Sequence, residues 1–381
     1  MNQVLTKRSL IVLAALAALL LATSGCAGGV RASSWTGLTV VGEMLYVADL
    51  QQARAMNATS GETLWTFPSN PEENNQGLFY ATPVVSDEGQ VFFASQLTTG
   101  GFFSQRQSIV WALDAETGQE QWRFEGAAGM YVEGGALGDG LFVIGNGDGN
   151  VYALNRETGS LQWSFETGHR VWSTPLIVSD TVYVGSMDRN LYALDLDSGE
   201  VQWTFETDGA FGAKPALNDG TLYVGAFDDT LYAIDAETGD EQWSFHREDW
   251  FWGSPAVRED TVYAVDVKGK VYAVNAQNGE ERWHKSLVTD QNQPVSVRAG
   301  GALNQDGSRL FISARNGVLY ALSTADGLVE WSTPAEGRGL SDPVVSNSLV
   351  YQSLILGTPR IRALELDRGR EAWSFPVPEE G

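Results

Sequence analysis

The chain of 381 residues contains a single cysteine, Cys26, and only three histidines. One cysteine excludes an intramolecular disulfide and every metal site that needs several thiolates. The histidines, His169, His246 and His284, do not pair at a spacing typical of metal ligands. We expect them to be solvated at strand edges. The fold must therefore be held by its core and its hydrogen bonds, for which this length is sufficient.

Positive charge is also scarce. The chain has 24 Lys and Arg against 48 Asp and Glu, a net charge of −24. Residues 1–25 contribute Lys7 and Arg8 and no acid, so the remainder carries −26. Nucleic-acid phosphates are bound by clustered Lys and Arg, which argues against nucleic acid as a partner. The negative charge keeps an exported domain soluble or steers a basic partner, and the sequence leaves both open.

Signatures of catalysis and cofactor binding are missing as well. No phosphate-binding loop, nucleophile elbow or zinc motif occurs. The segment 145–150 (GNGDGN) has the polar spacing of a calcium loop but lacks the full oxygen set and the distal Glu. We predict a tight hairpin turn there. The sequence thus predicts no catalytic residue and no metal site.

Long apolar runs are confined to the start of the chain. Lys7 and Arg8 precede the run Leu10–Ala22, and small residues lead to Cys26. This order of charge, short apolar stretch and small residues is typical of an export signal. A cysteine directly after it resembles a bacterial lipoprotein signal, although Thr23 stands where Leu is usual. The alternative is ordinary secretory cleavage.

The lipoprotein resemblance implies removal of residues 1–25 and a diacylglycerol on Cys26, with residues 26–35 as a lipidated tether. The chain would then be held on the extracytoplasmic side of a membrane. In a two-membrane cell this means the outer membrane and periplasm, since Ala27 and not Asp follows the cysteine. In a one-membrane cell it means the cell surface.

Eight segments share one motif, in which Gly follows Ala by six positions and Trp follows it by ten. The spacings between these tryptophans are 57, 41, 40, 40, 40, 48 and 42 residues. A period near 40 with strand-forming segments is typical of a propeller with one four-stranded sheet per repeat. The eight motifs are Ala55/Gly61/Trp65, Ala112/Gly118/Trp122, Ala153/Gly159/Trp163, Ala193/Gly199/Trp203, Ala233/Gly239/Trp243, Ala273/Gly279/Trp283, Ala321/Gly327/Trp331 and Ala363/Gly369/Trp373.

One repeat shows the expected strands most clearly. Residues 175–178, 181–185, 191–194 and 201–205 are apolar or alternating, and turn residues separate them. No helical period of 3.6 recurs after the signal. We predict an all-β, eight-bladed β-propeller over residues 36–377, with four antiparallel strands per blade and a short tail at 378–381. We expect it to be monomeric.

The motif resembles the tryptophan-docking repeat of the quinoprotein, or PQQ-like, propellers over roughly residues 36–377. The resemblance implies that each Trp lies between its own motif's Ala and the next motif's Gly turn. Trp373 would then close the ring against Gly61. We therefore expect the eight motif tryptophans to be structural. Because each segment contains four strands of its own, we also expect closure without a swapped strand.

The resemblance leaves several functions open. Dehydrogenases that use PQQ have long insertions, a Ca²⁺ site and usually a vicinal disulfide, whereas this chain is short, has no second cysteine and shows no such insertion. Its size, signal and lack of insertions are similar to those of the propeller lipoproteins of outer-membrane β-barrel assembly. We therefore expect a non-enzymatic scaffold without cofactor that binds an envelope protein. Small-ligand or carbohydrate binding at the channel mouth is the first alternative, and a PQQ-dependent dehydrogenase is the less favoured second one.

Candidate binding residues come from the predicted register. In a propeller, blade-to-blade loops share a face with the hairpins between second and third strands. The long loops 69–79 and 286–299 and the long hairpin 96–108 fall on that face, where binding is expected. An aromatic ring before the first strands either plugs the channel as core or forms a contact patch or ligand funnel. Its members are Tyr80, Tyr131, Trp172, Phe211 and Trp252.

Overall fold

The structure, a computed structural model, describes residues 36–99, 105–289 and 291–376. Several sequence predictions lie outside these residues. They are the signal 1–25, Cys26 and the whole tether 26–35, the tip of hairpin 96–108 and the tail 378–381. Within the described part of the chain, no helix is long and apolar enough to cross a membrane.

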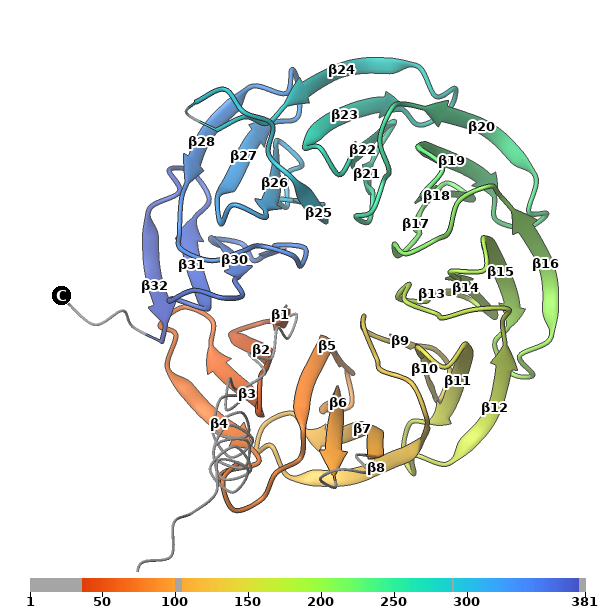
Figure 1. Cartoon of the computed structure of the whole chain (residues 1–381), viewed down its shortest axis with the longest axis vertical. Coiled ribbons are helices and arrows are strands. Elements are labelled where there is room, and N and C mark those ends of the chain that lie inside the picture. Colours follow the sequence, from red (N-terminus) through yellow and green to blue (C-terminus); the bar gives the residue numbers. More distant parts are fainter. Residues whose placement is uncertain (1–35, 100–104, 290, 377–381) are drawn as a thin grey trace, which may run out of the picture. The chain divides into compact units, whose positions relative to one another are not determined.

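The described chain forms eight four-stranded antiparallel sheets arranged in a ring (Figure 1). Each sheet is made of four strands that are consecutive in the sequence. The first four blades are β1 Gly37–Val41, β2 Met44–Asp49, β3 Gln52–Asn57, β4 Thr63–Phe67; β5 Leu78–Val85, β6 Gln90–Thr99, β7 Gln105–Asp114, β8 Glu120–Ala127; β9 Ala136–Leu137, β10 Leu141–Gly145, β11 Asn150–Asn155, β12 Leu161–Glu166; β13 Leu176–Val178, β14 Thr181–Gly185, β15 Asn190–Asp195, β16 Val201–Glu206. The last four are β17 Ala216–Asn218, β18 Thr221–Gly225, β19 Thr230–Asp235, β20 Glu241–His246; β21 Ala256–Arg258, β22 Thr261–Val265, β23 Lys270–Asn275, β24 Glu281–Ser286; β25 Val297–Leu303, β26 Arg309–Ala314, β27 Leu319–Ser323, β28 Val329–Thr333; β29 Val344–Val345, β30 Leu349–Ser353, β31 Ile361–Glu365, β32 Glu371–Phe375. The prediction of an eight-bladed propeller is confirmed.

Burial differs systematically across a blade. The second strands are almost wholly buried, as in β10 and β18, because neighbouring blades cover both faces. The fourth strands alternate between exposed and covered residues, as in β12. They form the outer rim, with one face toward solvent. This explains why the second strands are continuous apolar runs, whereas the fourth strands carry charged residues around the motif tryptophan.

The motif tryptophans join neighbouring blades in the way that the resemblance implies. Each indole N–H donates to a carbonyl three residues before the next motif's glycine, at 2.7–3.1 Å. The pairs of donor and acceptor are Trp65 and Ala115, Trp122 and Arg156, Trp163 and Leu196, Trp203 and Ala236, Trp243 and Ala276, Trp283 and Thr324, Trp331 and Leu366, and Trp373 and Ala58. All eight tryptophans therefore make the same docking contact.

The burial of the motif indoles varies around the ring, although all eight make the same docking hydrogen bond. The buried ones are Trp122, Trp163 and Trp243. The half-buried ones are Trp65, Trp203, Trp283, Trp331 and Trp373. Because all of them lie on fourth strands at the outer rim, one edge of the indole can reach solvent while its N–H and one ring face stay engaged. These contacts give the motif tryptophans a structural role.

The motif alanine and glycine make room for the indole. Within its own blade each Trp is directly opposite the motif Ala, as Trp163 is opposite Ala153. A Cβ at Gly199 would lie 2.6 Å from the Trp163 ring, so glycine is required for space as well as for its φ of +72°. The three conspicuous residues of the motif thus belong to one interface between blades.

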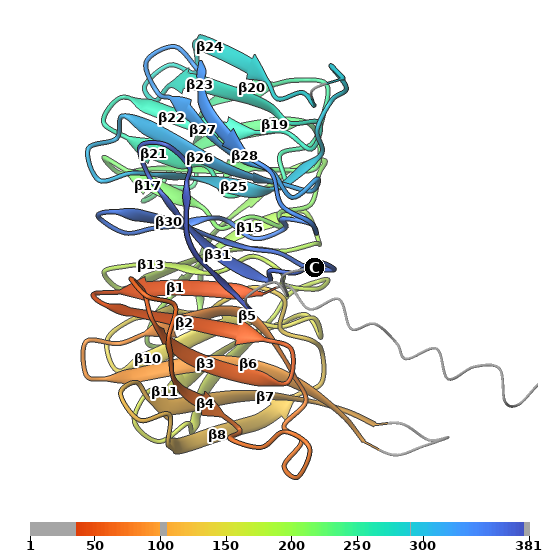
Figure 2. The same ribbon diagram turned by 90° about the vertical axis from the view of Figure 1, so that its left-hand side faces the viewer.

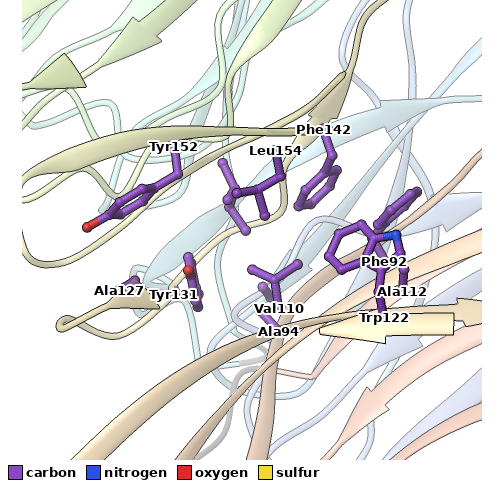
Figure 3. Packing of buried hydrophobic residues seen from close by; sticks show 12 residues of the cluster. Phe92, Ala94, Val110, Ala112, Trp122, Ala127, Tyr131, Phe142, Tyr152 and Leu154 are labelled. Atoms are coloured by element: carbon purple, nitrogen blue, oxygen red, sulfur yellow. The ribbon is translucent and has the colours of Figure 1, made fainter. Parts of the chain in front are cut away.

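Apolar side chains fill the space between adjacent blades. Figure 3 shows one such cluster, in which Phe92, Val110 and Trp122 of one blade meet Phe142 and Leu154 of the next. The rings of Phe92 and Phe142 are stacked with centroids 4.6 Å apart. Blade-to-blade packing of this kind is the core of the molecule, so the ring has no single central core.

The ring closes without exchange of strands, as predicted. Trp373 of the last blade donates to the Ala58 carbonyl of the first at 2.9 Å. Tyr351 donates to the same carbonyl at 3.1 Å. Arg360 also forms an ion pair with the buried Asp49 across this junction. Closure therefore relies on the same docking contact that joins the other blades.

The two faces of the ring are built from different turns. Blade-to-blade loops bond the hairpins between second and third strands, as where Thr167 N–H donates to the Gly149 carbonyl at 2.8 Å. The motif turns instead bond the first hairpins, as where Leu196 N–H donates to the Asp180 carbonyl at 2.8 Å. We call the first of these the hairpin face. It is the face on which the sequence places the long loops.

Candidate partner-binding face

One hairpin extends beyond the others. Strands β6 and β7 form ten residue pairs, from Gln90↔Asp114 to Thr99↔Gln105. The corresponding strands elsewhere form five or six pairs. Strand β5 pairs with β6 only as far as Gln96, and β8 pairs with β7 only as far as Ser108. Figure 2 shows the described ends of β6 and β7 projecting from one side of the ring. Its last pairs have no neighbouring strand on either edge among the described residues.

The long loop 69–79 lies beside this hairpin. The Ser95 hydroxyl donates to the Gln76 carbonyl at 2.8 Å. Phe79 is fully buried, and its N–H donates to the Leu50 carbonyl at 2.6 Å. Residues 72–75 are exposed. The loop thus has an anchored end and an accessible segment.

The loop 286–299 covers the hairpin of another blade. Leu287 N–H donates to the Gly269 carbonyl at 2.8 Å, and Val297 N–H donates to the Val267 carbonyl at 3.3 Å. Residues 291–294 are exposed. This loop therefore forms one wall of a pocket on the hairpin face.

The predicted aromatic ring separates into two groups. Tyr131 is 1% exposed and Phe211 is 0% exposed, and both belong to clusters between blades. Figure 3 shows Tyr131 lying among these core residues. The expectation that these two side chains form a contact patch is wrong, and the core alternative holds for them.

A one-residue shift explains this correction. Phe211 N–H donates to the Ser186 carbonyl, just as Val171 N–H donates to the Asn146 carbonyl. Phe211 is thus equivalent to Val171, not to Trp172. Successive side chains of an extended segment point to opposite sides, so the shift turns Phe211 into the core. Tyr80 lies on β5 opposite Ala94.

Trp172 and Trp252 are partly exposed, with ring centroids 6.5 Å apart. Two aromatic residues that the sequence did not single out extend this pair. Phe227 stacks on Trp252 at 4.7 Å and on Trp250 at 5.4 Å. Trp250 is 47% exposed. We call these four residues the aromatic wall.

Cations lie beside the aromatic wall. The Arg298 guanidinium is 4.7 Å from the centroid of Trp252, and that of Arg170 is 5.9 Å from the centroid of Trp172. Burial, followed by repulsion from Arg315, lowers the pKa of Arg298. Arg298 and Arg315 therefore lie close enough to repel each other. Together with Trp250, Trp252 and Lys268 they line a pocket of about 460 Å³.

The central channel holds a second pocket of about 360 Å³, lined by Glu133, Lys214 and Asp342. Burial, with a smaller effect of Asp342, raises the pKa of Glu133 to about 8. Burial also raises the pKa of Asp342, whose carboxylate accepts the Gly300 N–H. Burial lowers the pKa of Lys214, and Asp342 partly offsets this effect.

These channel residues do not fit the cofactor of the quinoprotein enzymes. PQQ carries three carboxylates, and Lys214 is the one cationic side chain lining this pocket, beside two acids. Among the described residues, no group of three His, Cys, Asp or Glu side chains is arranged to hold a metal ion. We derive no chemistry through that cofactor.

The minor predictions are also settled. His169, His246 and His284 are exposed, as expected. Segment 145–150 is a hairpin turn in which Asn146 N–H donates to the Asn150 carbonyl at 2.9 Å. Asn146 Nδ2 donates to the Gly129 carbonyl at 2.9 Å, so its side chain stabilises the neighbouring loop.

An eight-bladed ring joined by eight docked tryptophans defines a tryptophan-docking propeller of the quinoprotein type. The model of the family described as "Outer membrane protein assembly factor BamB" matches residues 105–210, 190–306 and 296–381. These matches span more than half of the chain, and the chain belongs to the BamB family.

Individual relatives match over shorter segments. The BamB protein of Yersinia pestis is 32% identical over 80 residues, which are 21% of this chain and 20% of that protein. The BamB protein of Shewanella oneidensis is 31% identical over 81 residues, again 21% and 20%. The alignments thus span about a fifth of the length of these curated relatives.

Solved structures share the fold over most of the chain. BamB from Moraxella catarrhalis has a TM-score of 0.68 at 17% identity, covering 85% of this chain and 95% of its own. The computationally designed Ika8 protein has a TM-score of 0.71 at 15% identity, with 87% and 96% covered. A quinohemoprotein alcohol dehydrogenase from Comamonas testosteroni has a TM-score of 0.62 at 15% identity, with 79% and 67% covered. At these identities the likeness concerns the fold alone.

Proposed function

We propose that this chain is a non-enzymatic scaffold of the cell envelope that binds a protein partner through its hairpin face, in the manner of a BamB-type assembly factor. The observation that carries the proposal is the projecting β6–β7 hairpin, whose last pairs leave two strand edges open. Open edges readily accept a strand from another chain. Family membership makes a component of outer-membrane protein assembly the expected partner.

We further propose that a lipid on Cys26 holds the ring at the membrane, on its extracytoplasmic side. The tether of residues 26–35 would let the propeller reach a membrane-bound partner. The aromatic wall, with Trp172 and Trp252, and the loops 69–79 and 286–299 complete the proposed contact face.

A crosslinked pull-down from envelope membranes tests the scaffold. The variant replaces residues 98–106 by Asn-Gly, which joins the paired residues Leu97 and Gln107 by a two-residue turn. We expect recovery of the membrane partner to fall while the thermal unfolding midpoint stays unchanged. Glu237→Lys, on an exposed motif turn of the opposite face, is the control and should not alter recovery. Unchanged recovery with the shortened hairpin would show that the wrong contact has been proposed.

A second candidate function is the binding of a small ligand at the channel mouth. The pocket of about 460 Å³ between Trp250, Trp252 and Arg298 favours it, because its size suits a small organic molecule. Activity with added PQQ and Ca²⁺ at ordinary enzyme rates would instead support a dehydrogenase and overturn the scaffold.

A further inference from the structure

The pocket beside the aromatic wall combines unpaired positive charge with exposed indole. This is unusual in a chain whose net charge is −24. Elsewhere arginines are mostly paired, as Arg247 is with Glu281 and Arg282 is with Asp260. Within the described residues, neither Arg298, Arg315 nor Lys268 has a carboxylate within salt-bridge distance.

The two arginines come from different segments of the chain. Arg298 lies on β25, and Arg315 follows β26 in the hairpin before β27. Arg315 N–H donates to the Ser296 carbonyl at 2.9 Å, which fixes its backbone beside the loop 286–299. The Nε of Arg315 is buried and has no hydrogen-bond partner among the described residues. Arg315 as a whole is half-buried, and buried polar atoms are normally hydrogen-bonded, so its side chain has donor capacity that the described residues leave unused.

Two acids of the adjoining hairpins, Asp266 and Asp188, already accept several hydrogen bonds. Asp266 accepts the N–H groups of Lys268 and Lys270, each at 2.9 Å, and the Tyr272 hydroxyl at 3.1 Å. Asp188 accepts the Gly168 N–H and the Tyr192 hydroxyl. These carboxylates stabilise their own loops, so the cations at the pocket remain available to a partner.

The aromatic side of the pocket is preformed. Phe227 stacks between Trp250 and Trp252, with interplanar angles of 17° and 26°. A rigid stack offers apolar area without ordering flexible side chains at the moment of binding. Guanidinium groups add planar donors suited to carboxylates. The pocket therefore suits a group that carries negative charge beside an apolar or aromatic side chain.

We propose that this pocket binds a segment of the partner protein in which an acidic residue is adjacent to an aromatic or large apolar one. The acidic side chain pairs with Arg298 and Arg315, and its neighbour packs on Trp250 and Trp252. This inference rests on the proposed scaffold function and names the chemistry of one contact. A polypeptide is favoured over a small ligand because the pocket lies on the hairpin face that also carries the projecting β6–β7 strands.

The test uses capped synthetic octapeptides and the purified, soluble chain without its signal. The probe is acetyl-(Asp-Phe)₄-amide, and acetyl-(Asn-Phe)₄-amide is the neutral comparison. Titration calorimetry is expected to show tighter binding of the acidic peptide, despite the like net charge of the protein. The double substitution Arg298→Gln and Arg315→Gln is expected to weaken it at least tenfold. Arg282→Gln, at an exposed cation near the motif-turn face, is the matched control and should leave it unchanged.

Several results would overturn the inference. Equal affinity for the two peptides, or no effect of the double substitution, would remove the role of the arginines. Saturable binding of 1-naphthoate without binding of either peptide would assign the pocket to small ligands. The unfolding midpoint of each variant confirms that the ring is intact. If the wild-type chain does not bind the acidic peptide but still recovers its partner in a pull-down that depends on the β6–β7 hairpin, this inference is wrong and the proposed scaffold function is retained.

Discussion

Closure of the ring depends on one glycine, and this dependence can be measured. A Cβ at Gly61 would lie 2.6 Å from Cδ2 and Cε3 of Trp373, the tryptophan that joins the last blade to the first. The substitution is Gly61→Ala. The control is Gly42→Ala in the same blade, where φ is also positive but no other described atom lies within 4 Å of the Cβ position.

The two substitutions differ in one energetic term. Alanine in the left-handed region costs about 1–2 kcal/mol at either site, since φ is +74° at Gly61 and +59° at Gly42. Overpacking against the indole adds about 1–3 kcal/mol at Gly61 alone. If the indole moves away instead, its bond to the Ala58 carbonyl is lost, at about 1 kcal/mol. We expect Gly61→Ala to lower the free energy of unfolding by about 2–5 kcal/mol and Gly42→Ala by about 1–2 kcal/mol.

Urea unfolding followed by tryptophan fluorescence gives both values. Comparing the two variants removes the backbone contribution that they share. The slope of the unfolding free energy against urea concentration shows whether both variants expose the same surface area on unfolding. Equal losses for the two variants would refute the docking explanation of closure. A larger loss at Gly42 would refute it as well.

Three further substitutions test other parts of the account. Glu133→Gln should remove a decline in stability with rising pH. The raised pKa of Glu133 means that the folded state holds this proton more strongly than the unfolded state between about pH 4.5 and pH 8. The unfolding free energy of the wild type should therefore fall by about 2–4 kcal/mol across that range, with solvent screening part of the effect. Parallel pH profiles for wild type and variant, measured by urea unfolding at pH 5 and pH 8, would contradict this. Arg362→Met should lower the free energy of unfolding, measured with urea, by about 3–5 kcal/mol. The buried guanidinium donates to Gln352 Oε1 and to the carbonyls of Gly317, Thr333 and Pro334, and all four acceptors lose this donor. A decrease below about 1 kcal/mol would contradict this structural role of Arg362. Cys26→Ser should release the chain from membranes into the soluble fraction, and continued membrane retention would remove the lipid anchor from the proposal.

The sequence could predict what the repeat dictates. A fixed offset from Ala to Gly to Trp sets the register of every blade, and the strands of the repeat around Trp203 fall where expected. Glycine is needed at the motif turn because the indole of the preceding blade occupies the space of a side chain. Local spacing therefore determined the fold.

The site was less predictable because its parts lie far apart in the chain. Trp252, Arg298 and Arg315 meet only when two blades stand side by side in the ring. Arg298 occupies the position equivalent to Trp172 and Trp252. A search for aromatic residues before the first strands does not find it, because it is an arginine. The run Trp250-Phe251-Trp252 was the available signal, since alternation turns Phe251 inward and leaves both tryptophans toward the pocket.

Buried Arg362 was missed for a similar reason. Most blades carry an aromatic residue at that position of the third strand, as at Tyr152, Tyr192, Tyr232 and Tyr272. Only the surrounding carbonyls, which come from another blade and a loop, show why a guanidinium is accommodated there. Sequence spacing carries no information on such acceptors.

Site-specific photocrosslinking in intact cells can show directly whether the hairpin face binds a protein of the envelope. A photoreactive residue replaces exposed Lys268 at the pocket, and in a second strain it replaces exposed Glu237 on the opposite face. We expect a discrete crosslinked adduct with a component of outer-membrane protein assembly from position 268 and none from position 237. An adduct with that partner from position 237 alone would contradict the account.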